Sequence, residues 1–468
     1  MACGTASQGK HFLPRLVSMA LPAEDVAQLE VVYRAEARRI RAALAARLGD
    51  VGLAEEAVQD AFVEAIEHWH GAGIPANRGG WLATTARRKA IDRLRRARAG
   101  AEKLALLAAD SSLYQNDSDV TALIFACCHP VLSRESQIAL TLRAVCGLST
   151  AQIAAAFLVS ESAMGQRLLR ARKALEPVQV RIPDPDELGG RLSEVLAVGY
   201  LVFNEGYLAS VGREPARRDL AAQAVELVRL LHFLMPREPE VLGLLALMLL
   251  HESRAATRFD GWGHLVRLAD QDRGRWDQDL IAEAMRTLGA AFRLRGPGPY
   301  QVQAAIAALH AEAVSYDETD WPQIRLLYDQ LQAMLCSADG KASPVVLLNR
   351  AVATRYVLGP QAALAEIEPL AAELDGYRLF HALRAGLLAG LGRDDEAAAA
   401  SERALALAGN PAERELLARR LSFLRLHRDP AYMGMVGRTS RVTQPRSTPG
   451  QVCAISTASS IVSVSSSE

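Results

Sequence analysis

The chain has 468 residues, of which 50% are hydrophobic and 23% charged, and its length allows roughly two to four globular domains. Ala, Leu, Arg and Glu dominate while aromatic residues make up only 5%, a composition that predicts an all-α fold. Lys plus Arg and Asp plus Glu both number 53. The zero net charge excludes a strongly basic chain overall, but not a nucleic-acid partner, because binding depends on local clusters of charge.

Membrane and targeting signals are absent from the sequence pattern. No apolar run reaches the ~18–20 residues that a membrane-spanning helix needs, and the richest run, 241–250, is too short. Lys10, His11 and Arg15 interrupt any apolar core of a signal peptide. The six cysteines are sparse and lack framework spacing, which favours a reduced protein over a disulfide scaffold. The sequence therefore predicts a cytoplasmic protein without membrane contact.

Helical periodicity divides the chain into three blocks that are separated by polar or proline-containing segments. The last segment is rich in Ser and Thr and cannot bury enough apolar surface to fold, so we expect it to be disordered. The predicted segments are an irregular lead-in 1–22, a first helical block 23–100, a linker 101–117, a second helical block 118–177, a linker 178–187, a third helical block 188–428, and a disordered tail 429–468.

The first block contains an acidic amphipathic helix over residues 53–69. Its apolar face carries Val58, Phe62, Ala65 and Trp69. An acidic face of this kind repels DNA but not a basic protein partner, and taken by itself the helix is better explained as an ordinary solvated helix. The residues predicted to share this exposed acidic face are Glu55, Glu56, Gln59, Asp60 and Glu64.

A basic helix follows over residues 80–96 and begins with Trp81. Its predicted buried stripe is Leu82, Ala86, Ala90, Leu94 and Ala97. The opposite face has Asp92 as its one acid, so phosphates are its natural neutraliser, and a merely solvated basic face is the alternative. The basic residues on that face are Arg87, Arg88, Lys89, Arg93, Arg95 and Arg96.

The second block has a helix-turn-helix pattern. The stretch 149–152, Ser-Thr-Ala-Gln, has the form of a capping box, and Ser160 can cap the next helix. That second helix is predicted to pack through Met164, Leu168, Ala171 and Leu175. Small or amide side chains followed by arginines suit a recognition helix in a major groove, with an ordinary helical hairpin as the alternative. Its predicted DNA-facing residues are Ser162, Gln166, Arg167, Arg170, Arg172 and Lys173.

The third block contains a short internal recurrence. Leu358-Gly359 returns as Leu391-Gly392, and Ala351 returns as Ala385, at an offset of 33 to 34 residues. This offset is typical of tetratricopeptide-like helical repeats, whose concave surfaces bind peptides or partner domains. A protein partner on this block is therefore a possibility.

Metal and catalytic interpretations find little support. The cluster 127–129, Cys-Cys-His, has no second Cys/His pair nearby, so buried structural thiols are favoured over a metal site. His251-Glu252 lacks the second histidine of a zinc-protease helix, and no phosphate-loop motif is present. We therefore expect no enzyme activity, no catalytic residue, no metal and no cofactor. The weakest alternative is catalysis by the polar group Asp270, Asp272, Arg273 and Asp277.

An acidic helix, a Trp-led basic helix, a linker and a helix-turn-helix that ends in 167–172, Arg-Leu-Leu-Arg-Ala-Arg, follow one another over residues 24–177. This order resembles RNA polymerase sigma factors of the extracytoplasmic-function group. The resemblance implies core RNA polymerase as a partner, through its β′ coiled coil and β flap, and promoter DNA as the other. It also implies that Glu56, Gln59, Asp60 and Glu64 contact the polymerase. The basic helix from Trp81 to Arg96 would read the −10 element, and the recognition helix the −35 element.

The third block resembles the extension of a sigma-factor subgroup with a tetratricopeptide-like C-terminal domain. Its landmarks are the segments 204–207, 247–251, 270–277 and 298–301. Ala163-Met164 and Gly165-Gln166 depart from the usual recognition helix and leave the −35 sequence open. We expect an alternative sigma factor regulated in cis by this extension. A helix-turn-helix regulator with a C-terminal sensor domain is the main alternative. A repeat-type adaptor protein is a third hypothesis, but it does not account for the pattern of residues 24–177.

Overall fold

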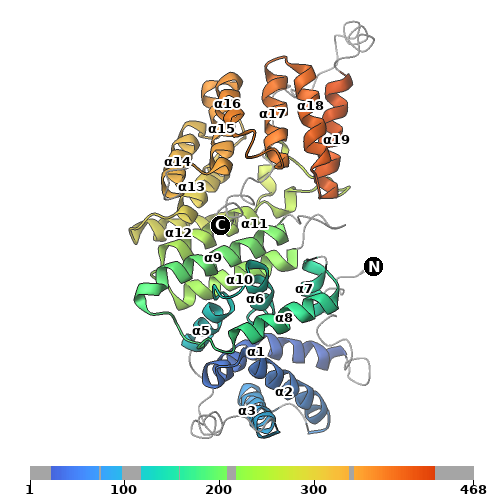
Figure 1. The fold of residues 1–468 in the computed structure, drawn as a ribbon, viewed down its shortest axis with the longest axis vertical. Coiled ribbons are helices and arrows are strands. Elements are labelled where there is room, and N and C mark those ends of the chain that lie inside the picture. Colours follow the sequence, from blue (N-terminus) through green and yellow to red (C-terminus); the bar gives the residue numbers. More distant parts are fainter. Residues whose placement is uncertain are drawn as a thin grey trace. The chain divides into compact units, whose positions relative to one another are not determined.

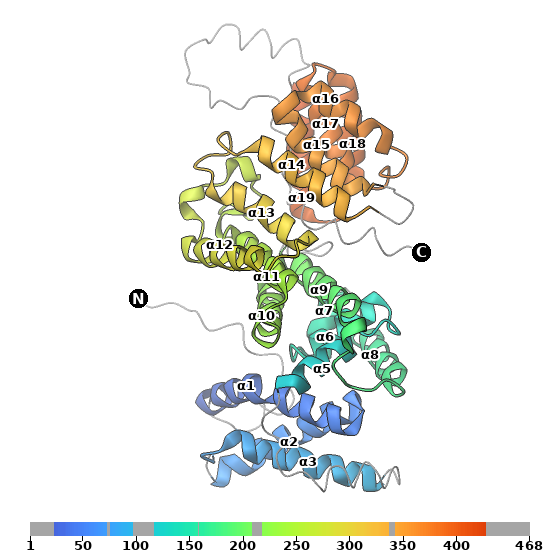
Figure 2. The same cartoon turned by 90° about the vertical axis from the view of Figure 1, so that its left-hand side faces the viewer.

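The computed structural model describes residues 23–72, 75–96, 117–157, 159–207, 218–336 and 342–426. The all-α prediction is confirmed: the regular elements of these residues are helices, and an isolated antiparallel bridge joins Phe259 to Leu265. Two compact units, Met1–Gly199 and Tyr200–Glu468, divide the chain, and each is described by itself (Figures 1 and 2). The predicted lead-in, the tail and nearly all of the linker 101–117 lie outside the described residues.

The first unit begins with three mutually packed helices, α1 (Ala23–Leu48), α2 (Val51–Ala72) and α3 (Arg78–Arg96). Gly49, with φ of 61°, ends α1 in the left-handed conformation that favours glycine. Asp50 then caps α2, because its carboxylate accepts the amide N–H of Leu53 at 2.9 Å. The helices bury Leu44, Phe62 and Leu82 between them.

Four further helices of the first unit are α5 (Asp117–Cys127), α6 (Arg134–Ala144), α7 (Thr150–Ala156) and α8 (Glu161–Leu175). Helix α5 packs against α1 and α6, and α6 packs against α7 and α8 (Figure 1). Phe125 and Leu140 are fully buried at these contacts. The second predicted block therefore folds onto the first within one compact unit.

Helix α9 (Pro185–Tyr207) starts within the predicted linker 178–187. Proline suits the first helical position because no backbone partner is needed for its missing N–H. The division between the two units falls after Gly199, inside this helix. Arg191 donates to the carbonyl oxygen of Phe125 at 2.7 Å, and Glu194 pairs with Arg134 at 2.7 Å. The first half of α9 is thus held to the helices of the second block.

The second unit is built around a helix that is buried on all sides, α11 (Pro239–Glu252). Helices α10 (Arg218–Leu234), α12 (Gln278–Arg293) and α13 (Pro299–Glu312) pack around it. The apolar run 241–250 is therefore a core helix, and none of the described helices is both long and apolar enough to span a membrane.

Helices α11 and α13 approach closely because glycine lines their contact. A Cβ atom on Gly243 would lie 2.7 Å from the amide nitrogen of Gln301, which is closer than real Cβ atoms come. Glu240 at the start of α11 accepts the amide N–H groups of Tyr300 and Gln301 at 3.0 and 3.1 Å, so it caps α13 from another helix. The landmark segment 298–301 thus has a packing role.

The remaining helices of the second unit include two successive hairpins. Ala351 and Ala385 are buried at equivalent places, and Gly359 and Gly392 take positive φ in the two turns. The recurrence in the sequence therefore marks two helical hairpins, while their tetratricopeptide-like designation stays a prediction (Figure 2). These helices are α14 (Trp321–Met334), α15 (Pro344–Leu358), α16 (Pro360–Ile367), α17 (Arg378–Gly390), α18 (Asp394–Ala406) and α19 (Pro411–Leu426).

Candidate promoter and polymerase interface

The pair formed by α2 and α3 places Trp81 against two aromatic rings of α2. The ring of His68 stacks on Trp81 with centroids 5.7 Å apart, and Trp69 meets it edge-on at 5.4 Å. The predicted stripe of α3 is buried at Leu82, Ala86, Ala90 and Leu94, while Ala97 lies outside the described residues. Amphipathic spacing therefore predicted correctly which face of α3 packs inward.

Three basic residues of α3 pair with acidic residues of α2. Arg93 bonds the carboxylates of Glu56 at 2.6 Å and Asp60 at 2.7 Å. Glu64 forms ion pairs with Lys89, at 2.6 Å, and with Arg88. The hydrogen bond from Lys89 is the main cause that lowers the pKa of Glu64. The predicted polymerase-binding and DNA-binding residues thus meet one another. These three residues are neutralised by α2 in this structure, and their predicted contact with phosphates stays a prediction.

The remaining predicted DNA-binding basic residues of α3 differ in their exposure. Arg95 and Arg96 are exposed near the end of the helix, and Arg96 donates to the carbonyl oxygen of Asp92 at 3.3 Å. Arg87 is half-buried. The basic face therefore has a paired part beside α2 and an exposed part at the C-terminal end of α3, where cations also suit the helix dipole.

Helices α7 and α8 form the predicted helix-turn-helix. The capping box is confirmed, since Ser149 N–H donates to Gln152 Oε1 at 2.8 Å and Gln152 N–H donates to Ser149 Oγ at 3.1 Å. Ser160 Oγ accepts the amide N–H of Ala163 at 3.2 Å and caps α8. The predicted packing residues of α8 are all buried, namely Met164, Leu168, Ala171 and Leu175.

Four of the six predicted DNA-facing residues of α8 are exposed: Ser162, Gln166, Arg170 and Lys173. Arg167 is half-buried, with its guanidinium 5.5 Å from the ring centroid of Phe157. Arg172 turns instead toward α2, where its Nη2 bonds Glu55. The exposed row matches a groove-reading face, whereas Arg172 is engaged inside the protein.

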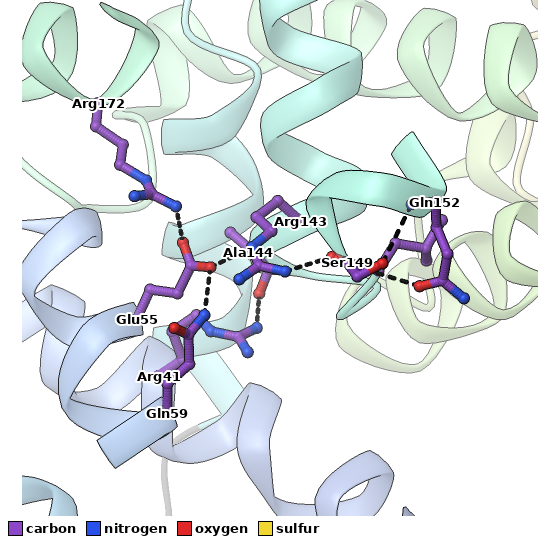
Figure 3. Close-up of polar contacts among 9 residues, drawn as sticks. Arg41, Glu55, Gln59, Arg143, Ala144, Ser149, Gln152 and Arg172 are labelled. Atoms are coloured by element: carbon purple, nitrogen blue, oxygen red, sulfur yellow. Dashed lines mark hydrogen bonds and ion pairs between the residues drawn. The ribbon is translucent and has the colours of Figure 1, made fainter. Parts of the chain in front are cut away.

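Glu55 is the centre of a polar contact among α2, α6 and α8 (Figure 3), which we call the Glu55 clasp. Its carboxylate is 1% exposed and bonds Arg143 of α6 and Arg172 of α8, while Gln59 donates to it at 3.1 Å. The expectation that Glu55 lies on the exposed acidic face is therefore wrong. Two guanidiniums satisfy the four lone-pair sites of a carboxylate well, which makes its burial tolerable.

Two further arginine contacts accompany the clasp. Arg41 of α1 donates through Nη1 to the carbonyl oxygen of Ala144, and Arg143 donates to the carbonyl oxygen of Leu148 at 2.8 Å (Figure 3). Both acceptors lie at or beyond the end of α6, where backbone carbonyls lack helical partners. Sequence reasoning missed Arg41 and Arg143 and placed Glu55 on the wrong face, because the three residues are 14 to 102 positions apart and only the packed helices bring them together.

The thiols of Cys127 and Cys128 are buried, as predicted. Burial raises the pKa of Cys128 to about 11, and its sulfur lies 3.5 Å from Thr141 Oγ1. Within the described residues, no three His, Cys, Asp or Glu side chains gather into a group that could hold a metal ion. The acids once considered for catalysis have structural roles: Asp272 and Asp277 cap η4 (Arg273–Arg275) and α12, and Asp270 pairs with Arg267.

Three family models match the chain. Residues 32–100 match sigma-70 region 2, residues 122–175 match sigma-70, region 4, and residues 191–292 match a family of unknown function (DUF6596). The two sigma-70 matches cover α1 to α3 and the helix-turn-helix, and they make the chain a sigma factor for promoter recognition. No enzymatic family is indicated.

An uncharacterized protein of Rhizobium meliloti (strain 1021) is 45% identical to the chain over 389 residues. The match covers 80% of this chain and 90% of the relative. The chain therefore belongs to the same family as this Rhizobium meliloti protein, and the match is long enough to include the region beyond the two sigma-70 domains. No solved structure matches the chain.

Proposed function

We propose that this sigma factor is an alternative factor of the extracytoplasmic-function group that acts in the cytoplasm. Helix α2 would dock on the β′ coiled coil through Gln59 and its acidic neighbours, and region 4 would meet the β flap. The observation that carries the proposal is the exposed row on α8, opposite a buried stripe, at the place where region 4 reads DNA. We further propose that the third block, residues 188–428, is a tetratricopeptide-like extension of the kind found in one subgroup of these factors.

The basic helix α3 would contact the −10 element in two ways. Arg95 and Arg96 are exposed and available to phosphates without rearrangement. Arg88, Lys89 and Arg93 are held by α2, so phosphates compete there with carboxylates of the same domain. Trp81, which is packed on His68 and Trp69, is placed to position the start of this helix.

The Glu55 clasp supports a closed form of the factor before it binds a promoter. The −10 and −35 elements lie roughly 25 base pairs, or about 85 Å, apart along B-DNA. Regions 2 and 4 cannot read both elements while a buried carboxylate of α2 holds α6 and α8. We propose that assembly with core polymerase separates the two regions and frees Arg172 for the −35 element.

The extension is proposed to regulate the factor in cis and to offer its repeats to a further protein partner. Support comes from α9, whose Arg191 and Glu194 bond α5 and α6 directly. Helix α9 begins after region 4, bonds α5 and α6 in its first half and runs on into the extension, so it can transmit a change in one to the other. The regulator alternative, a helix-turn-helix protein without polymerase binding, leaves the α2–α3 pair unexplained.

Pull-down of purified core polymerase and run-off transcription test the proposal together. Gln59→Ala combined with Asp60→Lys should abolish core binding and run-off transcription by the full chain. Because Asp60 pairs with Arg93, the control in the pull-down is Arg93→Gln, which loses the same ion pair but keeps the acidic face. Arg93 is itself a proposed −10 contact, so this control applies to core binding and not to run-off transcription. Undiminished core binding by the folded double variant would contradict the α2 assignment. Failure of the unaltered chain to bind core would favour the regulator alternative.

A further inference from the structure

The second unit contains a group of cationic and aromatic side chains that the sigma domains do not involve. It is formed where the ends of α9, α11 and α13 meet the turns η2 (Ala255–Thr257) and η4. Its buried positions include Arg258 and His251, which are 5% and 6% exposed. We call this group the cationic cluster; its members are Tyr207, His251, Arg254, Arg258, Arg273, Trp276 and His310.

None of the three guanidiniums of the cationic cluster has an acidic partner within 4.0 Å in the part of the chain that the structure describes. The carboxylates that act on Arg258 from farther away belong to Glu252 and Glu413. Glu413 is already paired with Arg378, at 2.8 and 2.9 Å, and burial raises the pKa of Glu252. The cationic cluster therefore has an unbalanced positive charge.

Neutral groups hold the guanidiniums in place. Arg258 lies 3.5 Å from the ring centroid of Tyr207 and donates to its carbonyl oxygen. Arg254 donates through Nη2 to the Tyr207 hydroxyl at 3.1 Å, and Arg273 donates through Nη1 to the carbonyl oxygen of Ala313 at 2.8 Å. These contacts fix the geometry of the cations without neutralising them.

The protonation of His251 follows from its neighbour. Arg254 Nη2 lies 2.6 Å from His251 Nδ1, and because a guanidinium can only donate, Nδ1 must accept. Burial and the adjacent guanidiniums hold the pKa of His251 well below its usual range, so the ring is neutral. Its proton is then on Nε2, which is buried and has no hydrogen-bond partner.

Two other buried donors share this condition. Trp276 is 3% exposed, and its ring centroid lies 4.8 Å from the guanidinium carbon of Arg273 and 5.9 Å from that of Arg254. Its Nε1–H has no acceptor among the described residues. Arg273 Nη2 is likewise buried without a partner. Buried donors are normally satisfied, so three in one cationic group indicate a missing acceptor.

We propose that the cationic cluster binds a small oxyanion, namely the carboxylate or phosphate group of a small molecule. Both groups offer only acceptor oxygens and a negative charge, which are the two properties that the cationic cluster lacks. The arginine fork suits either one. A cation would be repelled, and a neutral ligand would leave the charge unbalanced. The site lies in the extension, and its occupancy does not depend on the proposed sigma activity.

The test uses the full chain, exchanged into chloride buffer and titrated with sodium phosphate or sodium acetate at constant ionic strength. Calorimetry and thermal unfolding report binding. At roughly 100 times the Kd, the unfolding midpoint of the second unit should rise by about 5 °C or more. A response to phosphate alone identifies a phosphate site, and a response to acetate alone a carboxylate site.

Matched variants separate binding from the general stabilising effect of such salts. Trp276→Phe removes the unpartnered indole N–H and keeps an aromatic ring. Arg273→Gln removes the unpartnered Nη2 donor together with the positive charge. Both should lose the shift, while Arg275→Gln, an exposed arginine in the same turn, should keep it. If Arg273→Gln does not fold, Trp276→Phe decides. No shift in the unaltered chain, or equal shifts in all variants, would overturn the proposal.

Discussion

The Glu55 clasp and the cationic cluster both remove guanidiniums from water, but they compensate the charge differently. In the clasp, Arg143 and Arg172 share one buried carboxylate. In the cationic cluster, three guanidiniums share carbonyl oxygens, a phenol and aromatic faces, and no acid of the described residues is in contact with them. A buried ion pair with its hydrogen bonds satisfied completes a contact within the protein, whereas unbalanced cations with unpartnered donors indicate a place for something else.

The largest expected effect comes from breaking the compensation in the clasp. Glu55→Gln keeps the shape of the side chain but leaves Arg143 and Arg172 without a counter-charge. Removing one partner of a buried ion pair costs about 3–5 kcal/mol. We expect urea unfolding of the first unit to show a loss of about 3 kcal/mol.

The matched control for this prediction is Glu56→Gln on the same helix. Glu56 pairs with Arg93 at the surface, where such pairs contribute about 0.2–1 kcal/mol. Combining Glu55→Gln with Arg172→Met should recover part of the loss, because one of the stranded cations is removed as well. Equal, small losses for Glu55→Gln and Glu56→Gln would show that the clasp does not form in solution.

A second prediction uses pH to probe the cationic cluster. Burial, Arg254 and Arg273 lower the pKa of His310 from 6.5 to about 3. The unfolded chain therefore binds a proton that the folded chain excludes, so stability is full above about pH 6.5 and falls as the pH drops toward 3. From about pH 7 to about pH 5.5 the loss due to His310 should be about 1 kcal/mol.

His310→Gln isolates this contribution from that of the carboxylates. Denaturant unfolding of the second unit at the two pH values should show a smaller loss in His310→Gln than in the unaltered chain. His68→Gln, a change at an exposed histidine of the first unit, should leave the loss unchanged. The same loss in all three proteins would mean that the cationic cluster does not exclude the proton.

The sequence was sufficient wherever the information is local. The stripe of α8 and the capping box of Ser149 and Gln152 follow from spacings of three and four residues, and both are confirmed. Helix α3 was found in the same way, and the recurrence of Leu358-Gly359 as Leu391-Gly392 marked the two hairpins whose turns contain Gly359 and Gly392.

The two charged sites could not be predicted because they depend on how distant helices pack. Glu55 looks like its acidic neighbours in the sequence, and only the contact of α2 with α6 and α8 buries it. The cationic cluster joins Tyr207 to His310, across a hundred residues, and the landmark segments 204–207, 247–251 and 270–277 all contribute to it. The sequence marked these segments without showing why they belong together.

A third prediction contrasts Arg258 with Glu55 directly. Arg258→Met removes a buried guanidinium that has no acidic partner among the described residues and leaves a side chain of similar volume. Replacing poorly compensated buried ions by apolar residues is often neutral or stabilising, so we expect a change of less than about 1 kcal/mol in chloride buffer. Thermal unfolding of the second unit is the measurement. A loss as large as that of Glu55→Gln would show that Tyr207 alone satisfies this cation.

The smallest expected effect concerns the paired and exposed arginines of α3. Neither Arg88→Gln nor Arg95→Gln should cost more than about 1 kcal/mol of stability, since both residues lie at the surface. Their effects on promoter binding should differ, because Arg88 must leave Glu64 before it reaches a phosphate whereas Arg95 is already exposed. The logarithm of the binding constant falls as the logarithm of the salt concentration rises, and each lost phosphate contact decreases the steepness of this fall by about 0.9. Measured with holoenzyme on promoter DNA, Arg95→Gln should show this decrease in full and Arg88→Gln only part of it. If Arg88→Gln gave the full decrease, the α2 carboxylates would have to release α3 completely on the promoter, and the pairing would belong to the free protein alone.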